Sequence, residues 1–429
     1  MRMGPELIFA RCSLLIAVGV ATAGVRDATA WTSPVNVSNM PSGSRAFGPE
    51  AACDSFGNLH LLWAGGVDPA SNWHIWYQSY TGSSWSAASA LSTPGANRPD
   101  IAVDGGNNLH VCYEDDAEDD VWYRRWTSSG WSTPVNIMTG GRSISSHIAV
   151  DPAGANVMIA WHEDGQTGGE WDILARVCSG GSWGSTFNVS SDSALSVEPR
   201  VAIDSAGNIH VIWQSEGQEV YHRRRNADGT WTSKTRLDHT SLRSGVGSVA
   251  VAPNNFVHVA FSEDDGTGWE IFHTYYNGSS WSTPVNVSSH SGVSDDISPS
   301  LAIDAYNRLY VAWHDYSNVF FSSKPDLGTP WSARQAIVSG QYSTGDPDIV
   351  VDGSGNARVF WQCRPIQESN WNIYYSAQSN PPPGPHGTVS GVVRNQYGTG
   401  ISGAMVTVAV TYVAVSGAGG TYSVLVPPG

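Results

Sequence analysis

The 429-residue chain has little lysine, no excess of positive charge and few cysteines. Lysine occurs only at Lys234 and Lys324, and the formal net charge is −16. Nucleic-acid binding needs a basic surface, so this composition argues against a nucleic-acid partner. The five cysteines are scattered and show no C-x-x-C spacing, which excludes a dense disulfide framework. A disulfide formed after export and buried free thiols are both open alternatives.

Long apolar runs are also absent, apart from one near the N-terminus. Arg2 and Arg11 precede this run, which covers residues 14–23 and is too short to span a bilayer as a stable helix. Cleavage sites of the small-x-small type follow at 21–23 and 28–30. We therefore predict a secretory signal peptide at residues 1–30, a secreted (extracellular or periplasmic) mature protein, and no membrane span.

Glycine and tryptophan are abundant, with 46 and 19 copies, and the tryptophans mark an internal repeat. A phrase of the type Trp-Ser-Thr-Pro-Val-Asn begins at seven positions that are 46–54 residues apart: Trp31, Trp85, Trp131, Trp183, Trp231, Trp281 and Trp331. Two other phrases recur between them, exemplified by 99–113 and by Ile75-Trp-Tyr. Each unit holds four short apolar runs separated by turn residues, which is the size of one propeller blade.

Seven units predict an all-β fold, a seven-bladed β-propeller over residues 31–380. The last unit lacks the strand that begins with Trp-Ser, and an orphan copy of that strand lies at 31–38. We expect this N-terminal strand to complete the last blade, which leaves no unpaired edge where the ring closes. A Pro-rich linker at 381–386 and a small C-terminal β-sandwich module at 387–429 follow.

Most repeated polar residues have a structural explanation. An aspartate ends the first strand in six units, with Ala252 in its place in the fifth, and a glycine or asparagine follows closely: Asp54, Asp104, Asp151, Asp204, Asp304 and Asp352. This is typical of a turn in which the carboxylate accepts backbone N–H groups. Four histidines share one position on the second strand, which favours hydrogen-bonded packing over catalysis: His60, His110, His210 and His258.

The departures from the repeat are more informative about function. Four units carry an extra tryptophan in the connection after the second strand, Trp73, Trp171, Trp269 and Trp371, where the others have Asp119, Gln218 and Ser317. Acids gather in the same loops. One interpretation is a set of sugar-stacking platforms on one rim of the disc. The alternative is that each tryptophan packs between blades and the acids are solvated. Calcium is a weak prospect because no twelve-residue ligand loop is present, and we expect no metal or cofactor.

A catalytic site would need converging groups at the mouth of the axis. The candidates for acid–base pairs are His162, Glu163, Asp164, His314, Asp315 and Tyr316. Arg98 and Arg200 could neutralise an anionic sugar. These residues lie far apart in the sequence, so their shared rim does not make them neighbours.

The blade phrases Pro-x-Ile-Ala-Val-Asp, Gly-Asn-x-His-Val-x-Trp and Trp-Ser-x-Pro-Val-Asn-Val-Ser resemble those of secreted bacterial propellers built from sialidase-like (BNR-like) repeats. The resemblance implies the propeller fold over 31–380. The sialidase Asp-box survives only as the fragment 228–231, and sialidases have six blades and an arginine triad, which this chain does not clearly supply. The glycine-rich phrases after residue 386 are similar to the start of a carboxypeptidase regulatory-like (transthyretin-like) β-sandwich.

The sequence thus favours a secreted, monomeric propeller that binds carbohydrate or another extracellular partner through one rim. The alternative is an enzyme, a sialidase-like glycoside hydrolase or a polysaccharide lyase that acts on extracellular glycans. A third is a non-catalytic scaffold for protein interaction.

Overall fold

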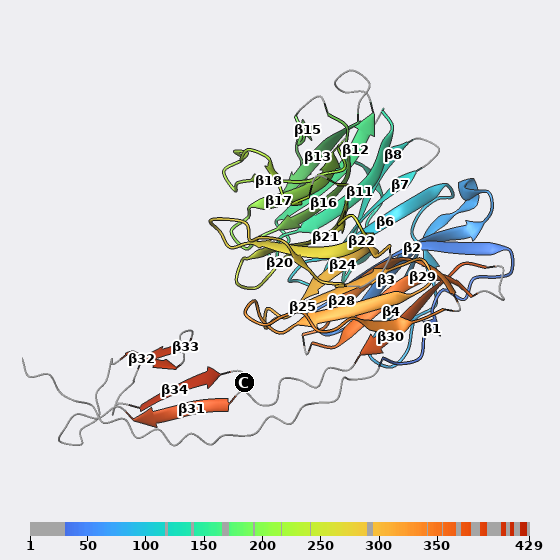
Figure 1. The fold of residues 1–429 in the computed structure, drawn as a ribbon. Helices are drawn as coiled ribbons and strands as arrows, with labels where there is room; N and C mark the ends of the chain where they lie inside the picture. The colour runs from blue at the N-terminus through green and yellow to red at the C-terminus, as the bar shows by residue number, and fades with distance from the viewer. Residues whose placement is uncertain are drawn as a thin grey trace, which may run out of the picture. The chain divides into compact units, whose positions relative to one another are not determined.

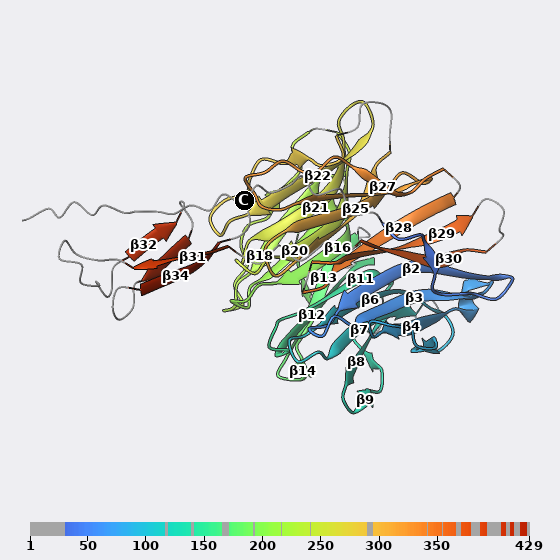
Figure 2. The ribbon, with the colours of Figure 1, turned by 90° about the horizontal axis from the view of Figure 1, so that it is seen from below.

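The computed structural model describes residues 31–378, except 116–118, 139–140, 165–170, 192–193, 216, 241, 290–294, 341, 354 and 366–369, together with four C-terminal strands. Seven antiparallel sheets, each built mainly from four strands in chain order, confirm the predicted seven-bladed propeller. The chain passes from blade to blade in sequence order, as the colours of Figures 1 and 2 show. The predicted signal peptide and the linker 381–386 lie outside the described residues.

The first four blades share one pattern of strands, from the axis outward. The first contains β2 (Ser44–Cys53), β3 (Leu59–Val67), β4 (His74–Tyr80) and β5 (Ser89–Ala90), with the short 3-10 helix η1 (Ala70–Asn72) between β3 and β4. The second contains β6 (Ala96–Val103), β7 (Leu109–Asp115), β8 (Asp120–Thr127), β9 (Gly130–Trp131) and β10 (Val135–Asn136). The third contains β11 (Ser143–Val150), β12 (Asn156–Asp164), β13 (Trp171–Ser179), β14 (Ser182–Trp183) and β15 (Phe187–Asn188). The fourth contains β16 (Ser196–Ile203), β17 (Ile209–Ser215), β18 (Val220–Arg225) and β19 (Thr235–Arg236).

The remaining blades repeat this order. The fifth contains β20 (Ser244–Val251), β21 (Val257–Asp264), β22 (Trp269–Tyr276) and β23 (Val285–Asn286). The sixth contains β24 (Ile297–Ile303), β25 (Leu309–His314), β26 (Val319–Lys324) and β27 (Gln335–Val338). The seventh contains β28 (Tyr342–Val351), β29 (Ala357–Pro365), β30 (Asn372–Gln378) and, from the other end of the propeller sequence, β1 (Val35–Asn36).

The N-terminal strand closes the ring as the sequence predicts. β1 pairs antiparallel with β30, with Val35 opposite Tyr375. The first strand of every blade contacts the first strand of the next, and β28 contacts β2. Figure 1 shows the blue N-terminal strands beside the orange strands of the last blade. The sheet that carries both ends of the propeller sequence therefore has its outer edge paired by β1.

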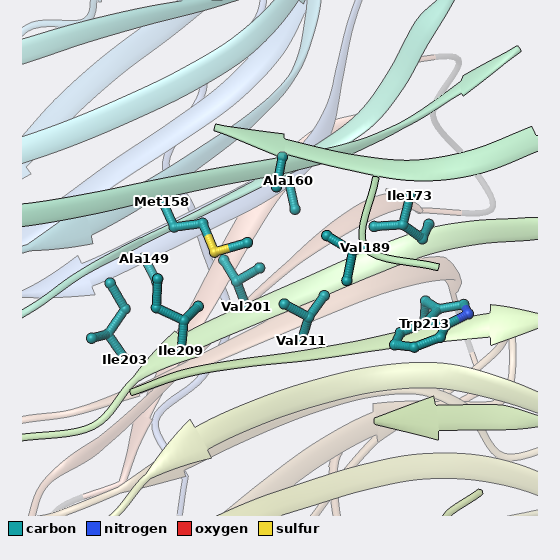
Figure 3. Close-up of a cluster of buried hydrophobic side chains, with 11 residues drawn as sticks. Ala149, Met158, Ala160, Ile173, Val189, Val201, Ile203, Ile209, Val211 and Trp213 are labelled. Atoms are coloured by element: carbon teal, nitrogen blue, oxygen red, sulfur yellow. The ribbon is translucent and has the colours of Figure 1, made fainter. Parts of the chain in front are cut away.

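The core lies between neighbouring blades. Five second strands bury a tryptophan completely: Trp63, Trp161, Trp213, Trp313 and Trp361. Between the third and fourth blades, Met158, Ile173, Val201 and Trp213 belong to one buried cluster (Figure 3). Burying a large apolar side chain contributes about 1.5–3 kcal/mol, so repetition of such clusters around the ring stabilises the whole disc.

The repeated polar residues have the structural roles expected of them. In the fourth blade the Asp204 carboxylate accepts the backbone N–H groups of Ala206 (2.9 Å) and Asn208 (2.8 Å), and Gly207 has φ 79°. The four second-strand histidines bond to an aromatic partner on the third strand through Nδ1 at 2.9–3.0 Å: His60–Tyr77, His110–Tyr123, His210–His222 and His258–His273. The four cysteines of the propeller, Cys53, Cys112, Cys178 and Cys363, are not disulfide-bonded.

The C-terminal region forms a separate compact unit. Its described strands make two antiparallel pairs, β31 (Gly387–Val392) with β34 (Thr421–Val426) and β32 (Met405–Val408) with β33 (Tyr412–Val415). All-β structure here agrees with the predicted fold class, whereas the assignment to a regulatory-like sandwich stays a prediction. Within the described parts of the chain, no helix has the length and apolar character needed to cross a membrane.

Candidate functional site

The connections after the second strands lie on the same rim as the starts of the following blades. The carbonyl oxygen of Trp73 accepts the backbone N–H of Gly95 (2.8 Å), and that of Trp269 accepts the N–H of Asp296 (3.0 Å). The backbone carbonyl groups of Trp371, Asp119, Gln218 and Tyr316 likewise accept an N–H group from the start of the next blade. In the sixth blade the acceptor is thus Tyr316, one residue before the Ser317 that the sequence alignment of the repeats suggests. The connection after the second strand therefore holds its blade to the next one in six blades, in long and short versions of the loop alike.

All four loop tryptophans are half-buried, and each ring already has a partner. Arg142, Arg243 and Arg364 lie over the rings of Trp171, Trp269 and Trp371, with guanidinium carbons 5.6, 5.3 and 5.5 Å from the ring centroids. Trp73 stacks on Phe47 with centroids 5.3 Å apart. Cation–π and stacking contacts of this kind fix the rings in place. The tryptophans thus pack at blade junctions and keep part of their surface accessible, and their role as sugar-stacking platforms stays a prediction.

The two candidate catalytic histidines are buried and act as hydrogen-bond acceptors. His162 Nδ1 accepts the backbone N–H of Glu198 at 3.1 Å, and burial together with nearby arginines lowers the pKa of His162 to about 3. His314 Nδ1 accepts the N–H of Tyr316 at 3.1 Å, and burial lowers the pKa of His314 to about 4. Both imidazoles are therefore neutral at physiological pH. They lie in the third and sixth blades, which are not neighbours in the ring.

The other acid–base candidates divide into supporting and exposed groups. The buried Glu163 carboxylate accepts Trp161 Nε1 (3.0 Å) and Ser143 Oγ (3.2 Å), and Asp315 accepts the backbone N–H of Asn318 (2.8 Å). Asp164 and Tyr316 are exposed. Glu163 and Asp315 therefore hold loop and strand ends, whereas Tyr316 and Asp164 are free to face a ligand.

A pocket of about 330 Å³ crosses the rim of the fourth, fifth and sixth blades. It contains two of the predicted residues, Trp269 and Tyr316, and Tyr316 is 56% exposed. The wall is otherwise polar, with three charged residues, two glutamines and two serines: Glu198, Arg243, Asp295, Gln214, Gln218, Ser262 and Ser298. Gly245, Val246 and Ile297 complete the lining. We call this site the rim pocket.

The histidines support the rim pocket from outside it. His162 holds the backbone of Glu198, and His314 holds the backbone of Tyr316, and both of these residues line the pocket. Glu198 and Tyr316 adopt positive φ values of 54° and 69°, a conformation that is uncommon for residues with a side chain. The hydrogen bond to each histidine therefore favours a conformation that the backbone would otherwise seldom adopt.

The two predicted arginines lie among acids. Arg98 forms an ion pair with Glu114 at 2.9 Å. The positive charge of Arg200 acts on Glu50, Asp100 and Asp346, opposing the rise in pKa that burial causes in each. Arg200 thus lies close enough to these carboxyl groups to favour their charged forms, and its role toward an anionic sugar stays a prediction.

Three carboxyl groups, Glu50, Asp100 and Asp348, lie on the first strands of the first, second and seventh blades, which are neighbours in the ring. Asp100 Oδ2 accepts the backbone N–H of Ile148 (2.6 Å) in the next blade, and Asp348 Oδ2 accepts that of Ala51 (2.7 Å). Burial raises the pKa of Asp100 to about 7 and that of Asp348 to about 6. Burial and the charges of both aspartates raise the pKa of Glu50 well above its usual value. We call Glu50, Asp100 and Asp348 the axial acids.

A second pocket, of about 490 Å³, lies beside the strand that closes the ring. Its surface is mostly apolar and includes Met40, Trp63 and Trp76. The rim pocket therefore offers more polar side chains for directional hydrogen bonds than this second pocket does.

The described residues include no group of three or more histidine, cysteine, aspartate or glutamate side chains arranged to hold a metal ion.

Sequence reasoning missed Glu198, Arg243 and Asp295. All three lie at the start of a blade, in the segments between the repeated phrases, where the alignment of the repeats carries no signal. The only sequence signal for a site in these segments was the presence of charged residues. Their meeting with Trp269 and Tyr316 depends on the packing of three blades side by side, which spacing along the chain does not reveal.

No protein-family model matches the sequence, and no curated protein sequence matches it. Solved structures share its fold at low identity. The BP39L lectin from Burkholderia pseudomallei matches with a TM-score of 0.58 and 12% identity, over 76% of this chain and 98% of the lectin. A PL25 ulvan lyase, bound to -[GlcA(1-4)Rha3S]-, matches with a TM-score of 0.55 and 12% identity, over 81% and 93% of the two chains. Hydrazine synthase from Kuenenia stuttgartiensis matches with a TM-score of 0.54 and 13% identity, over 79% and 98%. At these identities the similarity establishes the propeller fold.

Proposed function

We propose that the protein is a secreted carbohydrate-binding propeller and that the rim pocket is its binding site. The observation that carries the proposal is the composition of that pocket, in which the exposed Tyr316 and the half-buried Trp269 lie with amide, hydroxyl and charged side chains. Aromatic faces pack against the C–H groups of sugar rings, and amides and hydroxyls bond their hydroxyl groups. A lectin and a polysaccharide lyase among the structures of the same fold support a carbohydrate ligand.

Binding to a glycan array, followed by calorimetry with the best ligand, tests the proposal. Tyr316→Ala and Trp269→Ala should each weaken binding about five- to twelvefold, because each removes stacking surface worth about 1–1.5 kcal/mol. Phe56→Ala is the matched control, since Phe56 is an aromatic side chain that is 80% exposed on a turn between the first and second strands. A folded protein that binds no glycan, or binding that is unaffected by both pocket variants, would contradict the proposal.

The axial acids give a specific reason to keep a second candidate function, a glycan-cleaving enzyme. Carboxyl groups with pKa values raised to about 6 and about 7, as in Asp348 and Asp100, are typical of acid–base catalysts near neutral pH. Incubation with a panel of polysaccharides separates the reaction types, because a hydrolase creates new reducing ends and a lyase creates an unsaturated, ultraviolet-absorbing product. Product that disappears in Asp348→Asn, with the fold intact by circular dichroism, would select the enzyme. A blank panel would leave the binding function.

A further inference from the structure

The charged residues of the rim pocket are mainly acidic. Glu198 from the fourth blade and Asp295 from the start of the sixth both line the pocket, and both side chains are exposed. Arg243, from the start of the fifth blade, is the one cationic side chain among the twelve lining residues. The balance of charge that a ligand meets thus depends on whether Arg243 is available.

Arg243 is already engaged on two sides. Its Nη2 atom lies 3.7 Å from Asp264 Oδ2, and its guanidinium carbon lies 5.3 Å from the centroid of the Trp269 ring. Asp264 is not a lining residue, so it offsets the charge of Arg243 from outside the pocket. Within the described part of the chain, neither Glu198 nor Asp295 has a salt-bridge partner. Two carboxylates and one guanidinium therefore line the pocket, and because Asp264 shares the guanidinium from outside, the pocket presents a net negative charge to a ligand.

The backbone fixes both carboxylate-bearing residues on the pocket wall. Glu198 begins a bulge in the first strand of its blade, with its N–H bound to His162 Nδ1. Asp295 forms a bridge with Trp269, and the adjacent N–H of Asp296 donates to the Trp269 carbonyl at 3.0 Å. Attachment of this kind keeps the charges at the site in the absence of a ligand, which lowers the cost of ordering them on binding.

We propose that the rim pocket selects sugars that carry a protonated amino group and rejects sugars that carry carboxylate or sulfate. This inference rests on the proposed function and names the chemical class of its ligand. An ammonium group gains Coulomb attraction from Glu198 and Asp295, whereas an anionic group is repelled by both and finds only Arg243, whose charge Asp264 already offsets in part. The lyase that shares the fold is bound to a glucuronate- and sulfate-bearing ligand, which is the opposite charge class.

The test compares three oligosaccharides of equal length by calorimetry at pH 5.5, where amino sugars are protonated. They are oligomers of glucosamine, of N-acetylglucosamine and of galacturonic acid. The glucosamine oligomer should bind at least tenfold more tightly than its N-acetylated counterpart, and the uronic acid oligomer should not bind. The preference for glucosamine should shrink in 1 M NaCl, because salt screens exposed charges.

Charge-removing variants assign the selectivity to the pocket. Glu198→Gln with Asp295→Asn should reduce the preference for glucosamine to less than threefold while binding of N-acetylglucosamine changes little. Asp265→Asn is the matched control, because it removes an exposed carboxylate from the same rim, outside the pocket lining. Equal affinity for the two hexosamine oligomers, or preference for the uronic acid oligomer, would overturn this inference and leave the proposed function in place. Absence of binding to every oligosaccharide and to the glycan array would instead remove the proposed function.

Discussion

Single buried histidines set the conformation of the residues that line the rim pocket. His162 is neutral at physiological pH, because burial lowers its pKa to about 3. Its Nδ1 atom accepts a hydrogen bond from the N–H of Glu198. His162→Ala leaves that N–H without its partner, which should cost about 1–3 kcal/mol in the free energy of unfolding and weaken glycan binding. Urea denaturation measures the first effect, and calorimetry measures the second. His162→Gln, which keeps an acceptor, should recover part of both, whereas a catalytic histidine would show no such rescue.

Glu50 makes the stability of the propeller depend on pH. Its pKa is raised by burial and by the charges of Asp348 and Asp100, so the folded state favours the protonated form more than the unfolded state does. The corresponding stability is present at low pH and is lost as pH rises through the raised pKa values, which for Asp348 and Asp100 are about 6 and about 7. Buried histidines with lowered pKa values act in the opposite sense, and their effect is confined to pH below about 6.5.

Glu50→Gln should therefore raise the free energy of unfolding by about 1–2 kcal/mol at pH 8 and have a smaller effect at pH 5. Denaturation at several pH values between 5 and 8.5 measures the difference. Gln362→Glu, on the neighbouring strand β29, is a useful counterpart, because it adds an acid where the amide now accepts the N–H of Gly48 at 3.0 Å, and it should steepen the same pH dependence. A difference between Glu50→Gln and the unmodified protein that does not vary with pH would contradict this account.

At the scale of the element, the turn between the first and second strands stabilises each blade locally. In the fourth blade the Asp204 carboxylate accepts two backbone N–H groups and Asn208 Nδ2. Asp204→Ala should lower the free energy of unfolding by about 2 kcal/mol, since it removes all three bonds. Asp204→Asn keeps one carbonyl acceptor and should cost less. Thermal unfolding of the two variants provides the comparison, and equal losses would argue that charge, and not turn bonding, is what the position supplies.

The strands and turns could be predicted from the sequence, because their pattern recurs in every blade. The rim pocket could not be predicted in the same way. The turn aspartates and the second-strand histidines recur, so one local explanation covers every copy, and the hydrogen bonds of Asp204 and His210 agree with it. Trp269 and Tyr316 were found because they break the repeat. Glu198 and Asp295 were missed because a pocket depends on which side chains three neighbouring blades bring together, and a one-dimensional repeat gives no distance between blades.

At the scale of the whole molecule, stability depends on closing the ring with a strand from the far end of the propeller sequence. β1 pairs with β30, and Val37, just after β1, is buried against Phe360 and Ile373 in the core cluster that joins the first and last blades. Without this strand β30 would present an unpaired edge, and such edges pair with other chains. The seventh blade is therefore the place where the propeller is most easily opened.

Removal of residues 31–40 should lower the free energy of unfolding by at least about 3 kcal/mol, through lost burial of Val37 and lost strand pairing, and should cause self-association. Thermal unfolding and light scattering measure the two effects, and a synthetic peptide of residues 31–40 added in trans should reverse both. Ending the chain at residue 379 is the control, because residues 380–429 belong to the other compact unit and their loss should leave propeller unfolding unchanged. An unaltered melting temperature without residues 31–40 would mean that the contacts among the inner strands hold the ring shut without help from β1.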